Sequence, residues 1–265
     1  LAPIFHDLRA VKSTAEVNII RDAIAITKHG LDKVLSHLKP GVKEYELEAE
    51  LIGEFTRQRA TMGYEPIVAS GKNACTLHYI NNNGPCQDGD LLLIDVGANH
   101  ANYTADVTRV FPVSGRFTPR QKELYQAVLR VLQSSIERTV VGATLSQWKW
   151  DAQHQMAEEL RELGLINQNQ YASDSIENPA CKDFFMHGLG HSLGLGVHDP
   201  APSDGPLESG WVMTVEPGLY LPAEGIGIRL ENDVLVTESG PVDLCQDIPL
   251  QTNDIEDWIA SLQHA

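Results

Sequence analysis

The stretch LLLIDVGANHANYTADVTRVF, residues 91–111, consists of two apolar runs that each carry one aspartate, Asp95 and Asp106. A carboxylate in an apolar strand is costly to bury unless a metal ion, a cation or a hydrogen-bond network satisfies it. A turn centred between His100 and Ala101 would place the two aspartates opposite each other, with Cβ atoms about 5 Å apart on one face. The stretch therefore predicts a β-hairpin with a facing acidic pair.

A second hairpin of the same kind is predicted later in the chain. The segment WVMTVE is an apolar strand that ends in Glu216, and IRLENDVLVT returns as a strand that contains Glu231. Pro222 and Gly225 lie between these segments and are residues typical of turns. A turn between residues 223 and 224 would make Glu216 and Glu231 face each other. The chain would then hold two acidic pairs on two hairpins.

A similar pair of helices is expected before each hairpin. The pattern Ser13–Glu16 is a capping box, and apolar residues follow it at helical spacing. Gly41 and Gly142 separate the members of the two helix pairs. The expected helices cover about residues 14–38, 44–59, 118–140 and 147–163. The repeated order predicts a single α/β (α+β) domain with two pseudo-symmetric halves, roughly residues 1–116 and 117–265.

The segment FFMHGLGHSLGLGVH, residues 184–198, contains three histidines separated by four glycines. Each glycine costs a helix about 1 kcal/mol relative to alanine, so His187 and His191 are not expected to form a helical i,i+4 pair. The metalloprotease motif H-E-x-x-H is also absent. The segment is more typical of irregular chain or strand that passes close to a ligand, although alone it fits a flexible loop equally well.

Four carboxylates and one histidine form an oxygen-rich ligand set when the two hairpins come together. Such a set favours divalent ions in the order Mn²⁺ before Zn²⁺, and Co²⁺ or Fe²⁺ would also fit. Two ions could share a bridging hydroxide that acts as the nucleophile in a hydrolysis. The alternative is that each acidic pair is hydrogen-bonded locally or paired with arginine or lysine, which explains one pair more easily than both.

The sequence resembles the pita-bread metallopeptidases, which comprise methionine aminopeptidases, prolidases and Xaa-Pro aminopeptidases. The resemblance runs over about residues 8–245 and is closest to bacterial Xaa-Pro aminopeptidases in four segments: LLLIDVGANHANYTADVTRVFPVSGRFT, FFMHGLGHSLGLGVHD, VMTVEPGLY and GIGIRLENDVLVT. Methionine aminopeptidases usually lack the HGLGH segment and an arginine at the position of Arg229. The resemblance implies the pita-bread fold, in which helices cover a curved, mostly antiparallel sheet.

The resemblance also implies the metal ligands. These are Asp95, Asp106, His191, Glu216 and Glu231. Asp95 would bind one ion, His191 and Glu216 would bind the other, and the remaining two carboxylates would bridge them. The implied cofactors are two divalent ions, with Mn²⁺ first.

The implied activity is hydrolysis of the bond between an N-terminal residue and proline in a peptide with a free N-terminus. Glu216 would also transfer protons, while His78 and His198 would contact the scissile nitrogen and carbonyl. His187 and Arg229 would lie around the ligands or the substrate. The chain starts near the point where the family's N-terminal domain would join, so we expect that domain to be absent here. The resemblance leaves a homo-oligomer open.

Four other functions remain open at this point. Prolidase activity shares these motifs, and methionine aminopeptidase activity is a related possibility. The pattern G-x-S-x-G around Ser192 fits the nucleophile elbow of serine hydrolases, but the glycines and prolines that follow it exclude the helix which that elbow needs. A pita-bread binding module without activity would be expected to have lost its ligands, and all five are present.

Composition excludes some classes of partner. The chain has 265 residues, 42% of them hydrophobic, and a formal net charge of −16. A strongly acidic protein is not expected to bind nucleic acid or an anionic membrane surface. No apolar run is long enough for a transmembrane helix. The four cysteines are scattered, as is typical of a reducing compartment, so a cytoplasmic location is expected.

Overall fold

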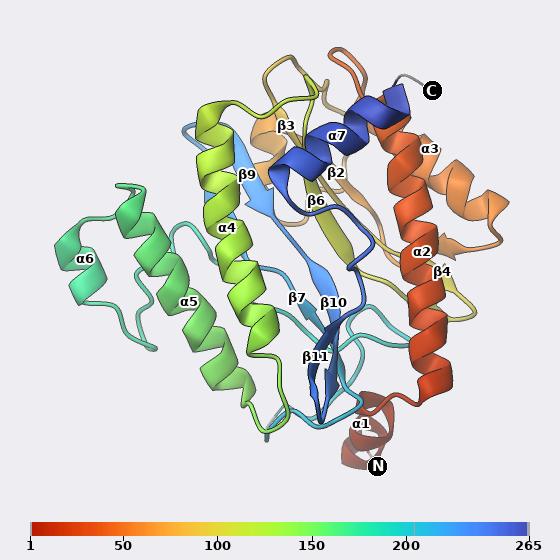
Figure 1. Cartoon of the computed structure of the whole chain (residues 1–265), viewed down its shortest axis with the longest axis vertical. Helices are drawn as coiled ribbons and strands as arrows, with labels where there is room; N and C mark the ends of the chain where they lie inside the picture. The colour runs from red at the N-terminus through yellow and green to blue at the C-terminus, as the bar shows by residue number, and fades with distance from the viewer. Residues whose placement is uncertain (1, 204, 264–265) are drawn as a thin grey trace.

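The computed structural model describes residues 2–203 and 205–263, in which helices surround a set of antiparallel strands (Figure 1). The helices are α1 (Ala2–Ala10), α2 (Thr14–His37), α3 (Glu44–Arg57), α4 (Pro119–Glu137), α5 (Leu145–Glu162), α6 (Gln168–Ala172) and α7 (Thr252–Gln263), with the short 3-10 helix η1 (Gly71–Cys75). The strands are β1 (Thr61–Met62), β2 (Ile67–Ser70), β3 (Leu91–Val96), β4 (Ala98–His100), β5 (Tyr103–Thr104), β6 (Val107–Pro112), β7 (Val212–Val215), β8 (Gly218–Leu221), β9 (Ile226–Arg229), β10 (Asn232–Thr237) and β11 (Gly240–Asp243).

The first hairpin forms as predicted, but its register differs. Strand β3 pairs with β6 so that Asp95 faces Thr108, and the predicted direct pairing of Asp95 with Asp106 is wrong. The turn lies one residue later than expected because Ala101 and Asn102 take the two positive φ angles, 48° and 70°, of a tight hairpin turn. Asp106 precedes Thr108 by two residues, so it lies diagonally across from Asp95 on the same face.

The second hairpin has the predicted register. Gly218 pairs with Arg229 in β8 and β9, and Val215 pairs with Asn232 in β7 and β10. The residue numbers of each pair have the same sum, 447, as the predicted pair Glu216 and Glu231. Strands β8 and β9 occupy most of the chain between Glu216 and Glu231, and only the chain between Leu221 and Ile226 forms the turn.

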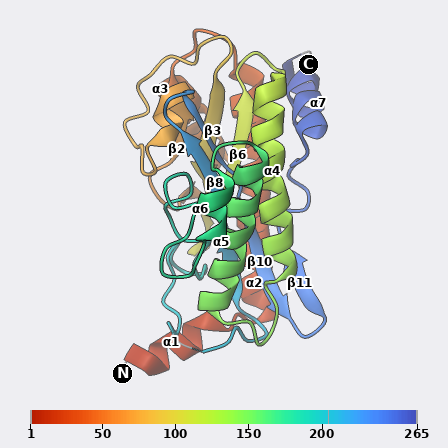
Figure 2. The ribbon, with the colours of Figure 1, turned by 90° about the vertical axis from the view of Figure 1, so that its left-hand side faces the viewer.

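The two predicted helix pairs are present and flank the strands. Helix α2 begins with the capping box of Ser13 and Glu16, and α4 begins with a corresponding capping box of Thr118 and Gln121. Helix α2 packs on α3 and α4 packs on α5. In Figure 1, α2 and α4 lie on opposite sides of the strands, and Figure 2 shows α4 and α5 side by side. This arrangement repeats the helix pair and hairpin in each half.

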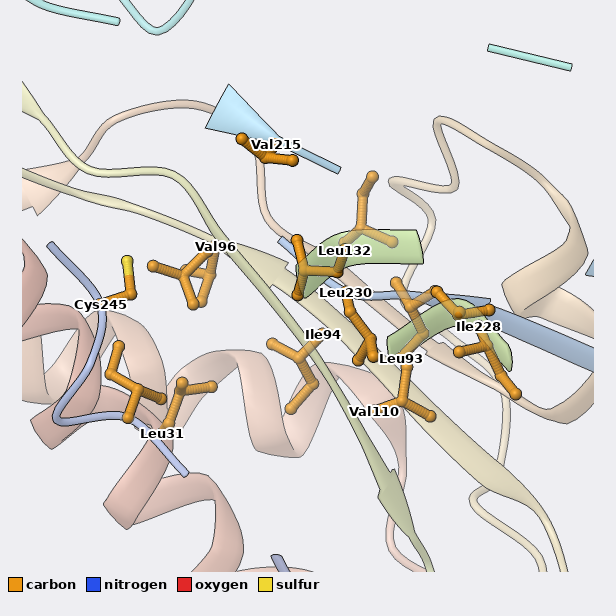
Figure 3. Packing of buried hydrophobic residues seen from close by; sticks show 14 of the residues in the cluster. Leu31, Leu93, Ile94, Val96, Val110, Leu132, Val215, Ile228, Leu230 and Cys245 are labelled. Atoms are coloured by element: carbon orange, nitrogen blue, oxygen red, sulfur yellow. The ribbon is translucent and has the colours of Figure 1, made fainter. Parts of the chain in front are cut away.

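One apolar core joins the strands to the helices (Figure 3). Leu93 and Ile94 of β3 lie with Leu31 of α2 and Leu132 of α4 in this core. Strand β3 is buried on both faces except at Asp95, whose exposure is intermediate. The carboxylate is therefore presented at the one position where the strand reaches a cavity. No helix in the described part of the chain is long and apolar enough to cross a membrane.

Candidate metal centre

A cavity of about 580 Å³ lies where the two hairpins meet the histidine segment. All nine residues predicted for the site line this cavity. They are His78, Asp95, Asp106, His187, His191, His198, Glu216, Arg229 and Glu231. The structure thus brings together side chains that are separated by up to 153 residues in the sequence.

Three of the predicted ligands form the tightest group. One ligand atom each of Asp106, His191 and Glu231 lies within 4.8 Å of the other two. His191 Nε2 is 3.4 Å from Asp106 Oδ2 and 3.8 Å from Glu216 Oε1. Asp106 and Glu231 are buried, with 4% and 2% of their surface exposed. These side chains are close enough together to hold a metal ion.

The carboxylates of this group are costly to ionise, because they are buried and repel one another. Burial raises the pKa of Glu231 well above its usual range, and the neighbouring carboxylates Asp106 and Glu216 raise it further. Burial likewise raises the pKa of Asp106, and it raises the pKa of Glu216 to about 7. Divalent cations would remove both penalties, because they replace lost hydration and neutralise the repulsion. The oxygen-rich donor set therefore fits a divalent metal ion.

Asp95 lies beside this group and is held by two neighbours. Its Oδ2 accepts a hydrogen bond of 2.5 Å from Arg229 Nη2. The Tyr64 hydroxyl lies 2.6 Å from Asp95 Oδ1 and 2.5 Å from Asp106 Oδ1, so it bridges the two aspartates. The acidic pair of the first hairpin is thus joined through a tyrosine, although the two residues are not directly paired in the sheet.

The other histidines surround the carboxylates. His187 Nε2 is 2.9 Å from the Tyr220 hydroxyl, and burial lowers the pKa of His187 to about 4. The imidazole of His187 is therefore neutral at physiological pH. The ring of His198 lies 4.1 Å from that of His191 in an edge-on arrangement. His78 and His198 are exposed to solvent, so they form the open side of the cavity.

Glycine allows the histidine segment to lie against the second hairpin. A Cβ atom on Gly190 would be 2.0 Å from the carbonyl oxygen of Thr214, a contact that no other residue could make. Thr214 Oγ1 accepts a hydrogen bond of 2.9 Å from the His191 amide, and Ser192 forms a β-bridge with Met213. The segment is thus irregular chain along a strand, as predicted, and it points His191 at the carboxylates.

The sequence did not single out three hydroxyl groups in this site. Besides Tyr64, Thr108 donates a hydrogen bond of 2.5 Å to Glu231 Oε2, and Tyr220 accepts one of 3.0 Å from Arg229 Nη1. Thr108 could have been found, because it lies two residues after Asp106 and strand alternation places both on one face. Tyr64 and Tyr220 are neutral donors that carry no motif in the sequence.

The position of Ser192 argues against the serine hydrolase. Its Oγ lies 3.4 Å from Lys12 Nζ, and Ser192 is not among the residues that line the cavity. The described residues that follow it form bends and bridges up to β7, where the nucleophile elbow requires a helix.

Comparison with known proteins agrees with this geometry. The model of the family Peptidase_M24, metallopeptidase family M24, matches residues 18–238. The chain belongs to this family. The Xaa-Pro aminopeptidase of Haemophilus influenzae is 39% identical over 96% of this chain and 62% of its own length. The Xaa-Pro aminopeptidase of Escherichia coli is 38% identical over 96% of this chain and 60% of its own length.

Solved structures of family M24 show the same fold. Zinc-substituted E. coli aminopeptidase P in complex with product superposes with a TM-score of 0.91, at 36% identity, over 98% of this chain and 62% of that chain. E. coli aminopeptidase P with the inhibitor Pro-Leu gives a TM-score of 0.92 at 36% identity, over 100% of this chain and 63% of that chain. The predicted pita-bread fold is confirmed. The chain spans about 60% of the length of these relatives.

Proposed function

We propose that this chain is the catalytic domain of an Xaa-Pro aminopeptidase. The observation that carries the proposal is that all nine residues expected from the family pattern line one cavity. The names of the relatives support the same activity. A chain with one or two of these residues replaced would instead favour a binding module, but all five predicted ligands are present in the sequence and line the cavity.

The proposed cofactors are two divalent ions, with Mn²⁺ preferred because four of the five ligands are carboxylates. Asp106, His191 and Glu231 form the centre of the site, and Asp95 and Glu216 complete it on either side. When bound, such ions activate water and polarise the carbonyl group that is attacked. The buried carboxylates, whose pKa values are raised, are the groups that must lose protons to accept the ions.

The side chains around the ligands have separate tasks in this proposal. Glu216 is the group that moves protons in this proposal, because its carboxylate lines the cavity 3.8 Å from His191 Nε2, where it can accept a proton from the attacking water. His78 and His198 donate hydrogen bonds to the substrate from the open side of the cavity. Neutral His187 and Arg229 form the remaining wall of the cavity, and both are hydrogen-bonded to the Tyr220 hydroxyl.

The substrate is proposed to be a peptide with a free N-terminus and proline at the second position. A prolidase that cleaves only Xaa-Pro dipeptides is the second candidate, because these enzymes share the site. We further propose a reducing, cytoplasmic compartment, since all four cysteines are free thiols. A homo-oligomer remains a prediction, which size-exclusion chromatography tests.

The decisive experiment compares substrates after removal and return of metal. Chelated protein should lose turnover of an Xaa-Pro-Xaa tripeptide, and Mn²⁺ should restore it. An Xaa-Pro dipeptide, a Met-Ala peptide and an N-acetylated tripeptide serve as competing substrates, and the acetylated one should resist cleavage. Asp106→Ala and Glu231→Ala should lose metal binding and turnover together, while Ser192→Ala retains both. Wild-type activity in either acidic variant contradicts the proposal.

A further inference from the structure

A buried ion pair lies directly behind the histidine segment. The side chains of Lys12 and Asp199 are each only 1% exposed, and Lys12 Nζ is 3.7 Å from Asp199 Oδ2. Arg9 also contacts Asp199, through the other carboxylate oxygen. Lys12 Nζ further donates to the Ala10 carbonyl at 3.1 Å and to Ser192 Oγ at 3.4 Å. The pair thus connects residues that are 187 positions apart.

Asp199 closes the loop that joins His191 to His198. Its Oδ1 accepts a hydrogen bond of 3.0 Å from the Gly196 amide, and its own amide donates one of 2.8 Å to the Ser192 carbonyl. The loop is packed tightly around the pair, because a Cβ atom on Gly194 would be 2.6 Å from Asp199 Oδ2 and 3.0 Å from Lys12 Cε. The carboxylate therefore ties the Gly196 backbone to Lys12, while the Asp199 amide closes the loop onto residue 192.

The cation of the pair comes from the segment that connects α1 to α2. The Lys12 amide donates a hydrogen bond of 2.8 Å to the Gly210 carbonyl, and Val11 forms a β-bridge with Trp211. Trp211 directly precedes β7, the strand that lies against His191 through Thr214. The segment around Lys12 and the histidine segment thus both lie against the chain that forms β7. In Figures 1 and 2, α1 lies at the lower end of the molecule, beside this connection.

Stability alone does not explain such a pair. A buried ion pair gains little over well-packed apolar residues of the same volume, because desolvation of the two charges offsets their attraction. What a buried pair does provide is a defined geometry, since a charge displaced from its partner remains unsatisfied. His198 is adjacent to Asp199 in sequence, and its exposed ring lies at the cavity, edge-on to the ring of His191.

We propose that Asp199, with Lys12 as its buried counter-ion, is a positioning residue that sets the place of the His198 ring at the cavity. This inference rests on the proposed function, in which His198 contacts the substrate. It extends the site beyond the residues that line the cavity to a carboxylate that touches neither ligand nor substrate. It also makes the N-terminal segment around Lys12 a part of the catalytic apparatus.

The test is a double-mutant comparison of Asp199→Ala, His198→Ala and the variant with both changes, each loaded with metal. Asp199→Ala should lower kcat/KM for an Xaa-Pro-Xaa peptide on the order of 10²-fold, the effect of misplacing a catalytic group by about 1 Å. It should leave metal content unchanged. The double variant should be no slower than His198→Ala alone, because Asp199 acts through that histidine.

Two further variants separate positioning from folding. Glu159→Ala removes a carboxylate with a similarly buried side chain, which is paired with Arg130 at 2.5 Å on α4 and α5, away from the cavity. This control should lose thermal stability yet keep wild-type kcat/KM. If Asp199→Ala does not fold, Gly194→Ala replaces it. The Cβ of the new alanine displaces the Asp199 carboxylate, and the variant retains every charged residue. The same loss of kcat/KM is then expected.

A measurement that does not depend on turnover distinguishes failure of the role proposed for Asp199 from failure of the proposed function. The ¹H–¹⁵N signal of the His198 ring, assigned by its loss in His198→Ala, should shift in Asp199→Ala or Gly194→Ala and stay unchanged in Glu159→Ala. Failure of the wild type to cleave any Xaa-Pro peptide would refute the proposed function and leave this signal to decide the inference. An unshifted ring signal, or losses that multiply in the double variant, would overturn the inference.

Discussion

Replacing Glu216 by glutamine should stabilise the metal-free protein at alkaline pH. Glutamine has the shape of the protonated glutamate but cannot ionise, so it removes the cost of a buried charge. Burial raises the pKa of Glu216 from 4.5 to about 7, and the nearby carboxylates Asp106 and Asp95 add to the shift. The folded protein therefore binds a proton more tightly than the unfolded chain does. Its stability must fall as pH rises from about 4.5 through 7.

The size of the effect follows from the shift. At 1.36 kcal/mol for each pKa unit, the raised pKa of Glu216 costs the metal-free fold about 3 kcal/mol at pH 8 and about 1 kcal/mol at pH 5.5. The advantage of Glu216→Gln over wild type should therefore grow by about 2 kcal/mol between these two pH values. Added Mn²⁺ should reverse the order, because the ions favour the ionised glutamate and the glutamine is a poorer ligand.

The assay is urea unfolding of EDTA-treated wild type and Glu216→Gln at both pH values, followed by circular dichroism. Comparing the two proteins at each pH cancels the titration of the groups that do not interact with Glu216. Glu224→Gln is a matched control, since Glu224 pairs with Arg120 at the surface and hydrogen bonding to that arginine lowers its pKa. A constant difference between wild type and Glu216→Gln across pH would refute the electrostatic account of the site.

Two more predictions concern the shape of the site. Tyr64→Phe removes the hydroxyl shared with Asp106 and should weaken metal binding by about 10–100-fold, measured by calorimetric titration of the chelated protein; unchanged affinity would contradict a bridging role. Gly190→Ala forces a Cβ to within 2.0 Å of the Thr214 carbonyl and should lower Tm by about 5–10 °C in a thermal melt. Gly188→Ala is its control, because the nearest atom would be 4.0 Å away, and equal melting of the two variants would exclude the steric argument.

The sequence determined much of the fold because its strands are strongly marked. Strand β3 was predicted correctly as an apolar strand that carries Asp95. The register of the second hairpin was correct because proline and glycine leave one short turn. In the first hairpin the positive φ angles fall on Ala101 and Asn102, and alanine rarely adopts a positive φ, so local residue preferences did not indicate this turn.

The convergence of the site residues was easier to predict than the register of the first hairpin. Side chains two residues apart in a strand lie on the same face, so a pairing error of two residues does not move them to the other face. Moving the pairing of Asp95 from Asp106 to Thr108 leaves all three side chains on one face, so the predicted convergence survives. The partners that the sequence missed are uncharged, and their roles depend on where the chain folds. Tyr64, for example, lies 31 residues before Asp95 and is identified only by its hydroxyl contacts.

Hydrogen bonds to backbone groups hold the carboxylates of the site close together. The two hairpins are joined directly: the Asp106 amide donates to Asp233 Oδ2 at 3.1 Å, and the Glu231 amide donates to the Thr108 carbonyl at 3.1 Å. Arg109, fully buried, donates at 2.7 Å to the Glu231 carbonyl from behind. Backbone contacts thus hold the ligands at a separation that their charges oppose. In the metal-free protein this repulsion lowers the free energy of unfolding, and the pH dependence predicted for Glu216→Gln measures part of that loss.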